Sequence, residues 1–212
     1  MKNKMKSYKS PGKLPKYGSL SKIVSLIKPG ENVLDVGCSE GYLAKYLPDN
    51  KVWGIDYNTA AIKIAKIFCV EAKVVDLEKI ENLNIKLIFE QKFDIVVFAD
   101  ILEHLTNSRE VLQYFLKCLK PKGRIIVSLP NVALWRIRLR LLFGKFDYTD
   151  YGVLDKTHVH LYTYKSAEEF LLKENLRITK VDGAANLLGP LIRFFPVFKS
   201  LFSIHIILVA EK

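Results

Sequence analysis

The chain has 212 residues, a length that fits one domain and allows a sizeable core without disulfides or a structural metal. Half of the residues are hydrophobic and 26% are charged, and no apolar run approaches the roughly 20 residues that span a bilayer, so we expect a globular protein without a transmembrane helix. The basic start, Met1 to Lys6, leads into polar residues and lacks the apolar middle region of a signal peptide. We therefore expect a cytoplasmic protein whose thiols, Cys38, Cys69 and Cys118, stay reduced.

The chain is strongly basic, with 33 Lys and Arg against 22 Asp and Glu and a formal net charge of +11. Part of the excess lies in residues 1–18, which we predict to be a flexible, solvated tail ahead of a single domain over residues 19–212. Attraction to nucleic acid, anionic lipid or an anionic substrate is the alternative. Because the lysines of the tail are scattered and form no recognition motif, a nucleic-acid partner is not expected.

Short runs rich in Val and Ile alternate with helical patterns from Ser19 onward, which is typical of a mostly parallel sheet with helices on both faces. Two of the helix patterns, Thr59 to Phe68 and Asn107 to Leu119, place their apolar residues on one side. The predicted helices are Ser19 to Ile27, Gly41 through Leu47, Thr59 to Phe68 with Asn58 as its cap, and Asn107 to Leu119 closed by Pro121 and Gly123. The predicted strands are Asn32 to Val36, Lys51 to Asp56, Lys73 to Val75, Phe93 to Phe98 and Arg124 to Leu129.

The pattern changes after Pro130. No crossover helix separates the last two predicted strands, so we expect them to be antiparallel neighbours. We expect residues 131–163 and 184–203 to form lids over the strand ends. The elements predicted here are an aromatic and basic stretch (Leu134 to Phe146), a polar loop (Asp147 to His160), a helix (Ser166 to Glu174), a strand (Leu176 to Val181), a Phe-rich insertion (Leu187 to Phe202) and a last strand (Ile204 to Ala210).

Polar or small residues follow four of the predicted strands. Asp35 precedes a turn that contains Gly37 and Gly41, and glycines let a backbone approach a ligand closely. Asp56 ends the second strand, where a carboxylate can accept two hydrogen bonds from ribose hydroxyls. The third and fourth strand ends carry Asp76 and Ala99. In an open parallel sheet these ends meet at one edge, which predicts a nucleotide-type cofactor site there.

The glycine spacing separates two classes of cofactor. A dinucleotide fingerprint that starts at Gly37 requires glycine at positions 39 and 42, which hold Ser39 and Tyr42. The bulky Tyr42 would obstruct the close packing of helix on strand that the third glycine permits. A nicotinamide-dependent oxidoreductase is therefore disfavoured.

Together these segments resemble the class I S-adenosylmethionine-dependent methyltransferases from about Ser19 to the C-terminus. The resemblance implies a Rossmann-like, doubly wound, seven-stranded sheet that is mostly parallel with an antiparallel C-terminal strand. It implies S-adenosylmethionine as the cofactor and S-adenosylhomocysteine as its product. The site residues that it implies are Asp35 and Gly37 near the methionine moiety, Asp56 on the ribose, Asp76 on the adenine, Tyr57 and Leu77 beside its ring, and Ala99 near the reacting centre. Ser39, Gly41 and Tyr42, in and after the same turn, are also expected to bind the cofactor.

The acceptor is less constrained. Leu129 to Asn131 followed by residues 144–158 are similar to a branch of this family that includes the methionine-biosynthesis-associated methyltransferase-like group and proteins linked to glycan assembly. This resemblance identifies a lid and not a ligand, so a small molecule, a sugar and a lipid-linked intermediate all stay open as acceptors. RNA methylation is an alternative, although no Asn/Asp-Pro-Pro-Tyr/Phe-type motif follows the fourth strand. A non-catalytic module that only binds the cofactor is another.

Two histidines are the leading catalytic candidates. The segment Asp100 to His104 resembles the Glu-x-x-Glu-His element that binds a divalent metal in ubiquinone-pathway O-methyltransferases and small-RNA 2′-O-methyltransferases, and His158 resembles a later histidine of the RNA enzymes. The resemblance implies transfer to oxygen, with Asp100, Glu103, His104 and His158 as the catalytic candidates. We favour a metal-free role for His104 or His158 as general base or substrate ligand and assign no metal site, while Mg²⁺ or Mn²⁺ on the four side chains stays open.

Two apolar segments can be lids or membrane contacts. The run Trp135 to Phe143 carries Arg136, Arg138 and Arg140, and three arginines spread around a helix favour a lid that packs its apolar side on the domain over one that lies in a membrane surface. Four phenylalanines of the insertion are likewise expected to roof the pocket or to pack a dimer: Phe194, Phe195, Phe198 and Phe202.

Overall fold

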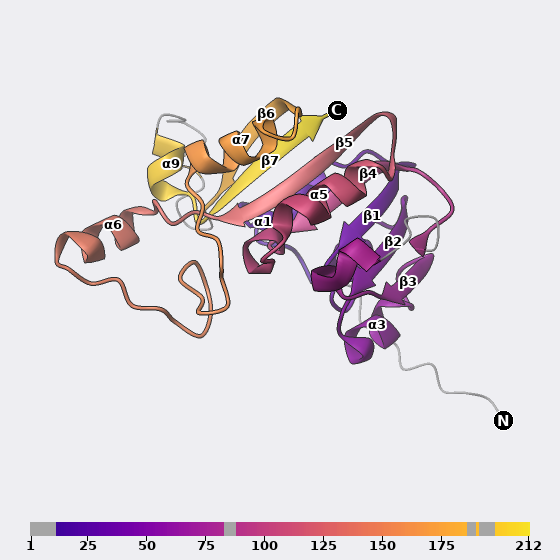
Figure 1. Cartoon of the computed structure of the whole chain (residues 1–212), viewed down its shortest axis with the longest axis horizontal. Helices are drawn as coiled ribbons and strands as arrows, with labels where there is room; N and C mark the ends of the chain where they lie inside the picture. The colour runs from indigo at the N-terminus through magenta and orange to yellow at the C-terminus, as the bar shows by residue number, and fades with distance from the viewer. Residues whose placement is uncertain (1–11, 83–87, 186–189, 191–197) are drawn as a thin grey trace.

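The computed structural model describes residues 12–82, 88–185, 190 and 198–212. Its seven-stranded sheet has the order β3-β2-β1-β4-β5-β7-β6 (Figure 1), and β7 alone runs antiparallel, to both β5 and β6. The mostly parallel, doubly wound sheet with antiparallel final strands is confirmed. The strands are β1 (Asn32–Val36), β2 (Lys51–Asp56), β3 (Glu71–Val74), β4 (Phe93–Ala99), β5 (Leu119–Pro130), β6 (Arg177–Ala184) and β7 (His205–Glu211).

Helices cover both faces of the sheet. The central strands β1 and β4 alternate their side chains between two apolar clusters, so that Val33 and Ile95 face one layer while Leu34 and Phe98 face the other. The first layer contains α1 (Ser19–Ser25), α2 (Tyr42–Lys45) and α3 (Thr59–Ala65). The second contains the 3-10 helix η1 (Leu77–Asn82), α5 (Ser108–Leu116) and α7 (Tyr164–Leu172).

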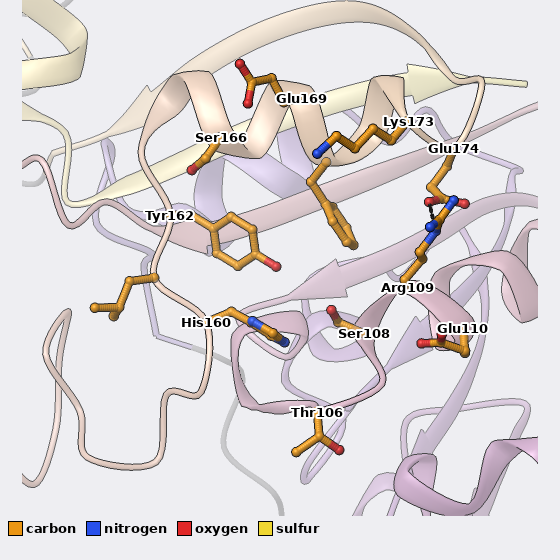
Figure 2. Close-up of a pocket in the computed structure, with 12 residues that line it drawn as sticks. Thr106, Ser108, Arg109, Glu110, His160, Tyr162, Ser166, Glu169, Lys173 and Glu174 are labelled. Atoms are coloured by element: carbon orange, nitrogen blue, oxygen red, sulfur yellow. Dashed lines mark ion pairs between the residues drawn. The ribbon is translucent and has the colours of Figure 1, made fainter.

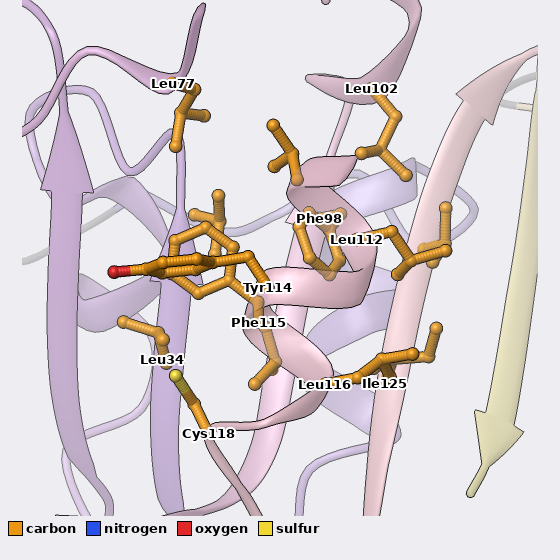
Figure 3. Packing of buried hydrophobic residues seen from close by; sticks show 14 of the residues in the cluster. Leu34, Leu77, Phe98, Leu102, Leu112, Tyr114, Phe115, Leu116, Cys118 and Ile125 are labelled. Carbon is orange, nitrogen blue, oxygen red and sulfur yellow. The ribbon is translucent and has the colours of Figure 1, made fainter. Parts of the chain in front are cut away.

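The second layer contains the largest buried side chains. Phe98 of β4 meets Phe115 of α5 edge to face, with ring centroids 6.0 Å apart, and Leu34 and Leu112 surround the pair (Figure 3). Aromatic pairs in this arrangement add about 0.5–1.5 kcal/mol beyond the area that they bury. The core therefore fixes β4 and α5 relative to each other, and the segment between them carries Asp100 to His104.

Several predicted element boundaries differ from the structure. The helix predicted to reach Leu119 ends at Leu116, because Leu119 already pairs with Phe93 as the first residue of β5. Pro121 and Gly123 therefore lie within that strand, where the pairing register shifts and Lys122 has φ +63°. Strand β3 begins at Glu71 and β6 extends to Ala184, in both cases because a neighbouring strand continues the ladder.

The lid helix α6 (Trp135–Leu142) packs on the domain only at its base. Leu134 and Ile137 form a small cluster with Leu154, whereas residues 138–152 are all exposed. The expectation that the apolar side of this helix packs on the domain holds only for its first turn, because α6 extends away from the sheet (Figure 1) and Leu139, Leu141 and Leu142 are exposed among the described residues. Among the described residues, no helix has the length and apolar character needed to cross a bilayer.

Part of the expected organisation falls on residues that are not described. Of the predicted tail, only residues 12–18 lie within the described residues. Most of the Phe-rich insertion, including Phe194 and Phe195, also lies outside them, while Phe202 belongs to the short helix α9 (Lys199–Phe202). The single domain, the tail and the second lid therefore stay predictions.

A glycine in β6 makes room for a buried hydrogen-bond pair. The Tyr164 hydroxyl lies 2.9 Å from Oγ of Ser203 and 3.1 Å from the carbonyl oxygen of Asp182. A Cβ atom on Gly183 would clash with both hydroxyl oxygens. Because Ser203 is fully buried, displacing this pair would leave polar groups without partners.

We expect Gly183→Ala to lower the free energy of unfolding by about 2–3 kcal/mol, through overpacking and loss of the Tyr164 to Ser203 hydrogen bond. Gly12→Ala is the matched control, since a Cβ there meets nothing within 4 Å, and should change stability by less than about 0.5 kcal/mol. Urea denaturation of the two variants measures both values. Equal losses of stability would contradict the packing described for β6.

Candidate active site

The turn after β1 is bound to the end of β2. The N–H groups of Gly37 and Cys38 both donate to the carbonyl oxygen of Ile55, each at 2.9 Å. Gly37 has φ +81° and Gly41 has φ +74°, in the left-handed region that favours glycine. Ser39 occupies the same region at φ +47°, which is strained for a residue with a side chain. The backbone of this turn is therefore held at a defined position above β1 and β2.

Asp56 joins this turn to α3. One carboxylate oxygen accepts from the N–H of Ser39 at 2.9 Å, and the other accepts from the N–H of Asn58 at 2.8 Å. Asn58 in turn caps α3 by accepting from the N–H groups of Ala60 and Ala61. Each oxygen of a carboxylate has a second lone pair, so Asp56 keeps two acceptor positions for a ligand.

A cavity of about 270 Å³ lies at the carboxyl ends of β1, β2 and β3, against the segment that follows β4. Five of the residues predicted to bind a cofactor lie in its wall. Sequence reasoning missed four others: three are apolar, whereas the prediction rested mainly on polar residues at strand ends, and Glu78 lies two residues beyond the predicted strand-end acid, Asp76. The predicted five are Gly37, Asp56, Tyr57, Asp76 and Leu77, and the four that were missed are Val75, Glu78, Ile101 and Leu105.

The other predicted cofactor residues do not lie in the cavity wall. Asp35 is buried within β1, and burial together with the nearby carboxylate of Asp56 raises its pKa to about 7. Tyr42 is half exposed, and its hydroxyl donates to Glu40 at 3.3 Å. Ser39, Gly41 and Ala99 lie in the turn and at the end of β4, beside the cavity.

Asp76 is held as an anion. Its carboxylate lies 2.9 Å from the ammonium group of Lys79 and accepts from the N–H of Glu78 at 3.2 Å. The hydrogen bond from Lys79 keeps the pKa of Asp76 below its usual value. A charged acceptor therefore stands at the rim of the cavity.

The structure brings Glu103, His104 and His158 together, as the sequence predicted. Each offers one ligand atom, and these atoms lie within 4.8 Å of one another; the two imidazole rings have centroids 4.7 Å apart. His158 reaches this position because the loop after α6 is bound to the short helix η2 (Leu102–His104): the N–H groups of Val159 and His160 both donate to the carbonyl oxygen of Glu103. His104 also lines the cavity, so the two sites are contiguous.

In both histidines Nδ1 takes part in a hydrogen bond. When the rings are neutral, Nε2 therefore carries a free lone pair that can accept a proton or bind a cation. Nδ1 of His158 lies 3.1 Å from the carbonyl oxygen of Val153, which can only accept. Nδ1 of His104 lies 3.0 Å from the hydroxyl of Thr157, whose proton goes to Asp155 at 2.7 Å, so this Nδ1 also carries hydrogen. Burial, with His158 second, lowers the pKa of His104 and favours the neutral ring.

The carboxyl group of Glu103 lacks a partner. Its side chain is 1% exposed, and neither oxygen accepts a hydrogen bond within the described part of the chain. Burial, with the charge of Asp100 second, raises the pKa of Glu103 well above its usual value. A buried carboxylate without a partner raises the free energy of the folded state. Binding a cation or taking up a proton would remove this cost at Glu103.

Asp100 does not join this cluster, so the structure brings together three of the four catalytic candidates. The backbone of Asp100 has φ +53°, and its carboxylate accepts from the hydroxyl of Ser128 at 2.6 Å. The other carboxylate oxygen lies 3.7 Å from Nε2 of His205, the first residue of β7. Sequence reasoning missed His205, because the pairing of His205 with Pro130 that places it beside β5 is not visible in the chain order.

A second cavity, of about 540 Å³, opens between α5 and α7 (Figure 2). Ser108, His160 and Tyr162 line one side, and the ion pair between Arg109 and Glu174 closes one end. It shares no lining residue with the first cavity. Its wall mixes two cationic with three acidic side chains, so its charge favours no single class of ligand.

Residues 16–181 match the family of proteins that contain a methyltransferase domain. A ubiquinone biosynthesis O-methyltransferase of Idiomarina loihiensis is 31% identical over 105 residues, which cover 48% of this chain and 43% of that protein. A phosphoethanolamine N-methyltransferase of Triticum aestivum is 29% identical over 105 residues, covering 48% of this chain and 21% of that protein. The matched segment thus spans less than half of each of these relatives.

Solved structures show the same fold. A magnesium protoporphyrin IX methyltransferase from Synechocystis PCC 6803 with bound S-adenosylhomocysteine superimposes with a TM-score of 0.63 and 17% identity, over 91% of this chain and 81% of that chain. An S-adenosylmethionine-dependent methyltransferase from Mesorhizobium loti gives a TM-score of 0.62 and 14% identity, over 91% and 97%. The chain therefore belongs to the methyltransferase domain family and has the class I, S-adenosylmethionine-dependent methyltransferase fold.

Proposed function

We propose that the protein transfers the methyl group of S-adenosylmethionine to a hydroxyl oxygen of a small-molecule, sugar or lipid-linked acceptor. The observation that carries this proposal is the contact between two sites: His104 lines the cavity beside Asp56 and also belongs to the Glu103, His104 and His158 cluster. The bound cofactor supplies a methyl group already activated on a sulfonium. The chain holds the two reactants in line and takes up the proton of the acceptor.

The cavity fits the adenosine part of the cofactor. Asp56 offers two acceptor positions to ribose hydroxyls, and the ionised Asp76 accepts from the adenine amino group. Leu77 and Ile101 supply apolar walls for the ring, with the largely exposed Tyr57 beside them.

The methionine part lies toward the turn and the end of β4. Gly37 is shared by the turn and the cavity, so the cofactor passes from one to the other there. In this proposal Asp35, Ser39, Gly41, Tyr42 and Ala99 face the methionine part from the turn and from β4, which leaves the methyl group directed toward the segment that holds His104.

The cluster fits a divalent cation. First-row cations bind nitrogen and oxygen ligands at roughly 2.0–2.2 Å, which places two ligands of one ion at most about 4.4 Å apart, so ligand atoms already within 4.8 Å need only small movements. Nε2 of His104, Nε2 of His158 and the carboxylate of Glu103 would hold the ion. Such an ion lowers the pKa of an acceptor hydroxyl. The unpartnered Glu103 favours this version over a metal-free imidazole base.

We expect Asp56→Ala to weaken the binding of S-adenosylhomocysteine at least about 100-fold, because it removes two charge-assisted hydrogen bonds worth about 1.5–3 kcal/mol each. It also releases the N–H of Ser39 and so loosens the turn. Isothermal titration calorimetry measures the affinity. Asp49→Ala, at an exposed acid outside the cavity, is the control and should bind as the wild type does. An unchanged affinity in Asp56→Ala would remove this residue from the cofactor site.

The cluster makes a separate prediction that does not need the acceptor. The wild-type protein should bind one Mn²⁺, detected by electron paramagnetic resonance, and His158→Ala should abolish the signal of bound Mn²⁺ while the affinity for S-adenosylhomocysteine stays within about twofold, since His158 does not line the cavity. Asp100→Asn is the control and should retain Mn²⁺, because Asp100 bonds to Ser128 instead.

Two outcomes would contradict this assignment. Loss of Mn²⁺ in Asp100→Asn equal to that in His158→Ala would show that Asp100 belongs to the cation site. A wild-type protein that binds no Mn²⁺ or Mg²⁺ would exclude the cation and leave the imidazoles as the candidate base.

A further inference from the structure

Large apolar side chains are exposed together at one end of the molecule. Residues 135–152 are here called the α6 tip, and from residue 138 onward they are exposed without interruption. Leu142 is 77% exposed, Phe143 is 71% exposed and Tyr151 is 83% exposed. Single exposed apolar residues are ordinary on protein surfaces, but a contiguous group marks a surface that meets a partner. The exposed apolar residues of the tip are Leu139, Leu141, Leu142, Phe143, Phe146, Tyr148 and Tyr151.

The helical part of this surface is amphipathic. Positions 135, 139 and 142 follow the i, i+4, i+7 spacing, so Trp135, Leu139 and Leu142 share one side of α6. At 100° per residue, Arg136 and Arg140 lie together on one flank of this apolar stripe and Arg138 lies on the other. The arginines therefore border the apolar side on both flanks, as in helices that lie in a membrane interface.

Several cations of this surface are available to bind anions. Arg140 pairs with Asp147 at 2.8 Å and Lys156 pairs with Asp150 at 2.6 Å. Within the described ranges, Arg136, Arg138 and Lys145 form no salt bridge. Residues 135–156 carry five cationic side chains against three carboxylates, on a chain whose formal net charge is +11. Charge of this sign opposes self-association of the tip and favours an anionic partner.

The position of the tip connects it with the candidate active site. Pro130, the last residue of β5, is separated from α6 by four residues, and β5 lies beside β4, with Ala99 opposite Ser128. Leu134, Ile137 and Leu154 fix the base of α6 to the domain. A surface that binds the tip would therefore lie near the edge of the sheet where the strands end (Figure 1).

We propose that the α6 tip docks the protein on anionic lipid bilayers. Leu139, Leu142 and Phe143 enter the interface between headgroups and acyl chains, while Arg136 and Arg138 bind lipid phosphates. The docking is peripheral and reversible, because one short helix and a loop supply the apolar area.

Cosedimentation with vesicles tests the proposal. The full chain should sediment with vesicles of phosphatidylcholine that contain about a third phosphatidylglycerol, and at least about tenfold less with phosphatidylcholine alone. The triple variant Leu139→Ser, Leu142→Ser, Phe143→Ser should lower the partition coefficient at least about tenfold. Arg136→Gln with Arg138→Gln should lower it about 25-fold at low salt, since each arginine near an anionic surface contributes roughly a fivefold effect.

A matched control separates the tip from exposed apolar residues in general. The control is the double variant Ile67→Ser, Leu172→Ser. Ile67 lies in the turn after α3 and is 51% exposed, and Leu172 ends α7 and is 54% exposed. This variant should sediment as the wild type does. Circular dichroism checks that all variants are folded. Equal loss of vesicle binding in this control would overturn the proposal. So would a wild-type protein that binds no vesicles but forms a dimer in analytical ultracentrifugation that the triple variant abolishes, because the tip would then bind a second copy of the chain.

Discussion

Two backbone N–H groups, from Ser39 and Asn58, converge on the carboxylate of Asp56 at the end of β2. This interaction sets the turn after β1 and the start of α3 at fixed positions around one cavity, and it leaves two acceptor positions on the carboxylate. The buried Asp35 lies near enough for the charge of Asp56 to raise its pKa, to about 7 together with burial. Below that pH Asp35 is mostly neutral, so it adds little negative charge beside Asp56 and Asp76 at this edge of the sheet.

The cofactor edge could be predicted because parallel strands carry their carboxyl ends to the same place. Gly37, Asp56 and Asp76 each follow a strand in the sequence, and the sheet order brings them to one cavity. The apolar wall could not be predicted in the same way, since Ile101 and Leu105 look like any other buried residue of the chain. Their position depends on how the segment after β4 turns back over the strand ends.

Backbone conformation explains why His158 lies beside His104 in the structure while Asp100 lies apart from them. His158 meets His104 because the N–H groups of the two residues after it bind the carbonyl oxygen of Glu103, a contact that no local pattern reveals. Asp100 lies outside the cluster of Glu103, His104 and His158, because its backbone has a left-handed φ and its carboxylate accepts a hydrogen bond from Ser128 on the neighbouring strand. For α6, the sequence suggested an apolar side but could not show that, among the described residues, only its first turn joins an apolar cluster.

The most direct measurement for the central claim is the melting temperature of the purified chain with S-adenosylhomocysteine and, separately, with NAD⁺. A ligand at about 100 times its dissociation constant adds about 2.7 kcal/mol of stability, which for a chain of this length corresponds to a rise of about 5–10 °C. We expect this rise with S-adenosylhomocysteine and no shift with NAD⁺. A shift with NAD⁺ and none with S-adenosylhomocysteine would contradict the assignment of the cavity beside Asp56.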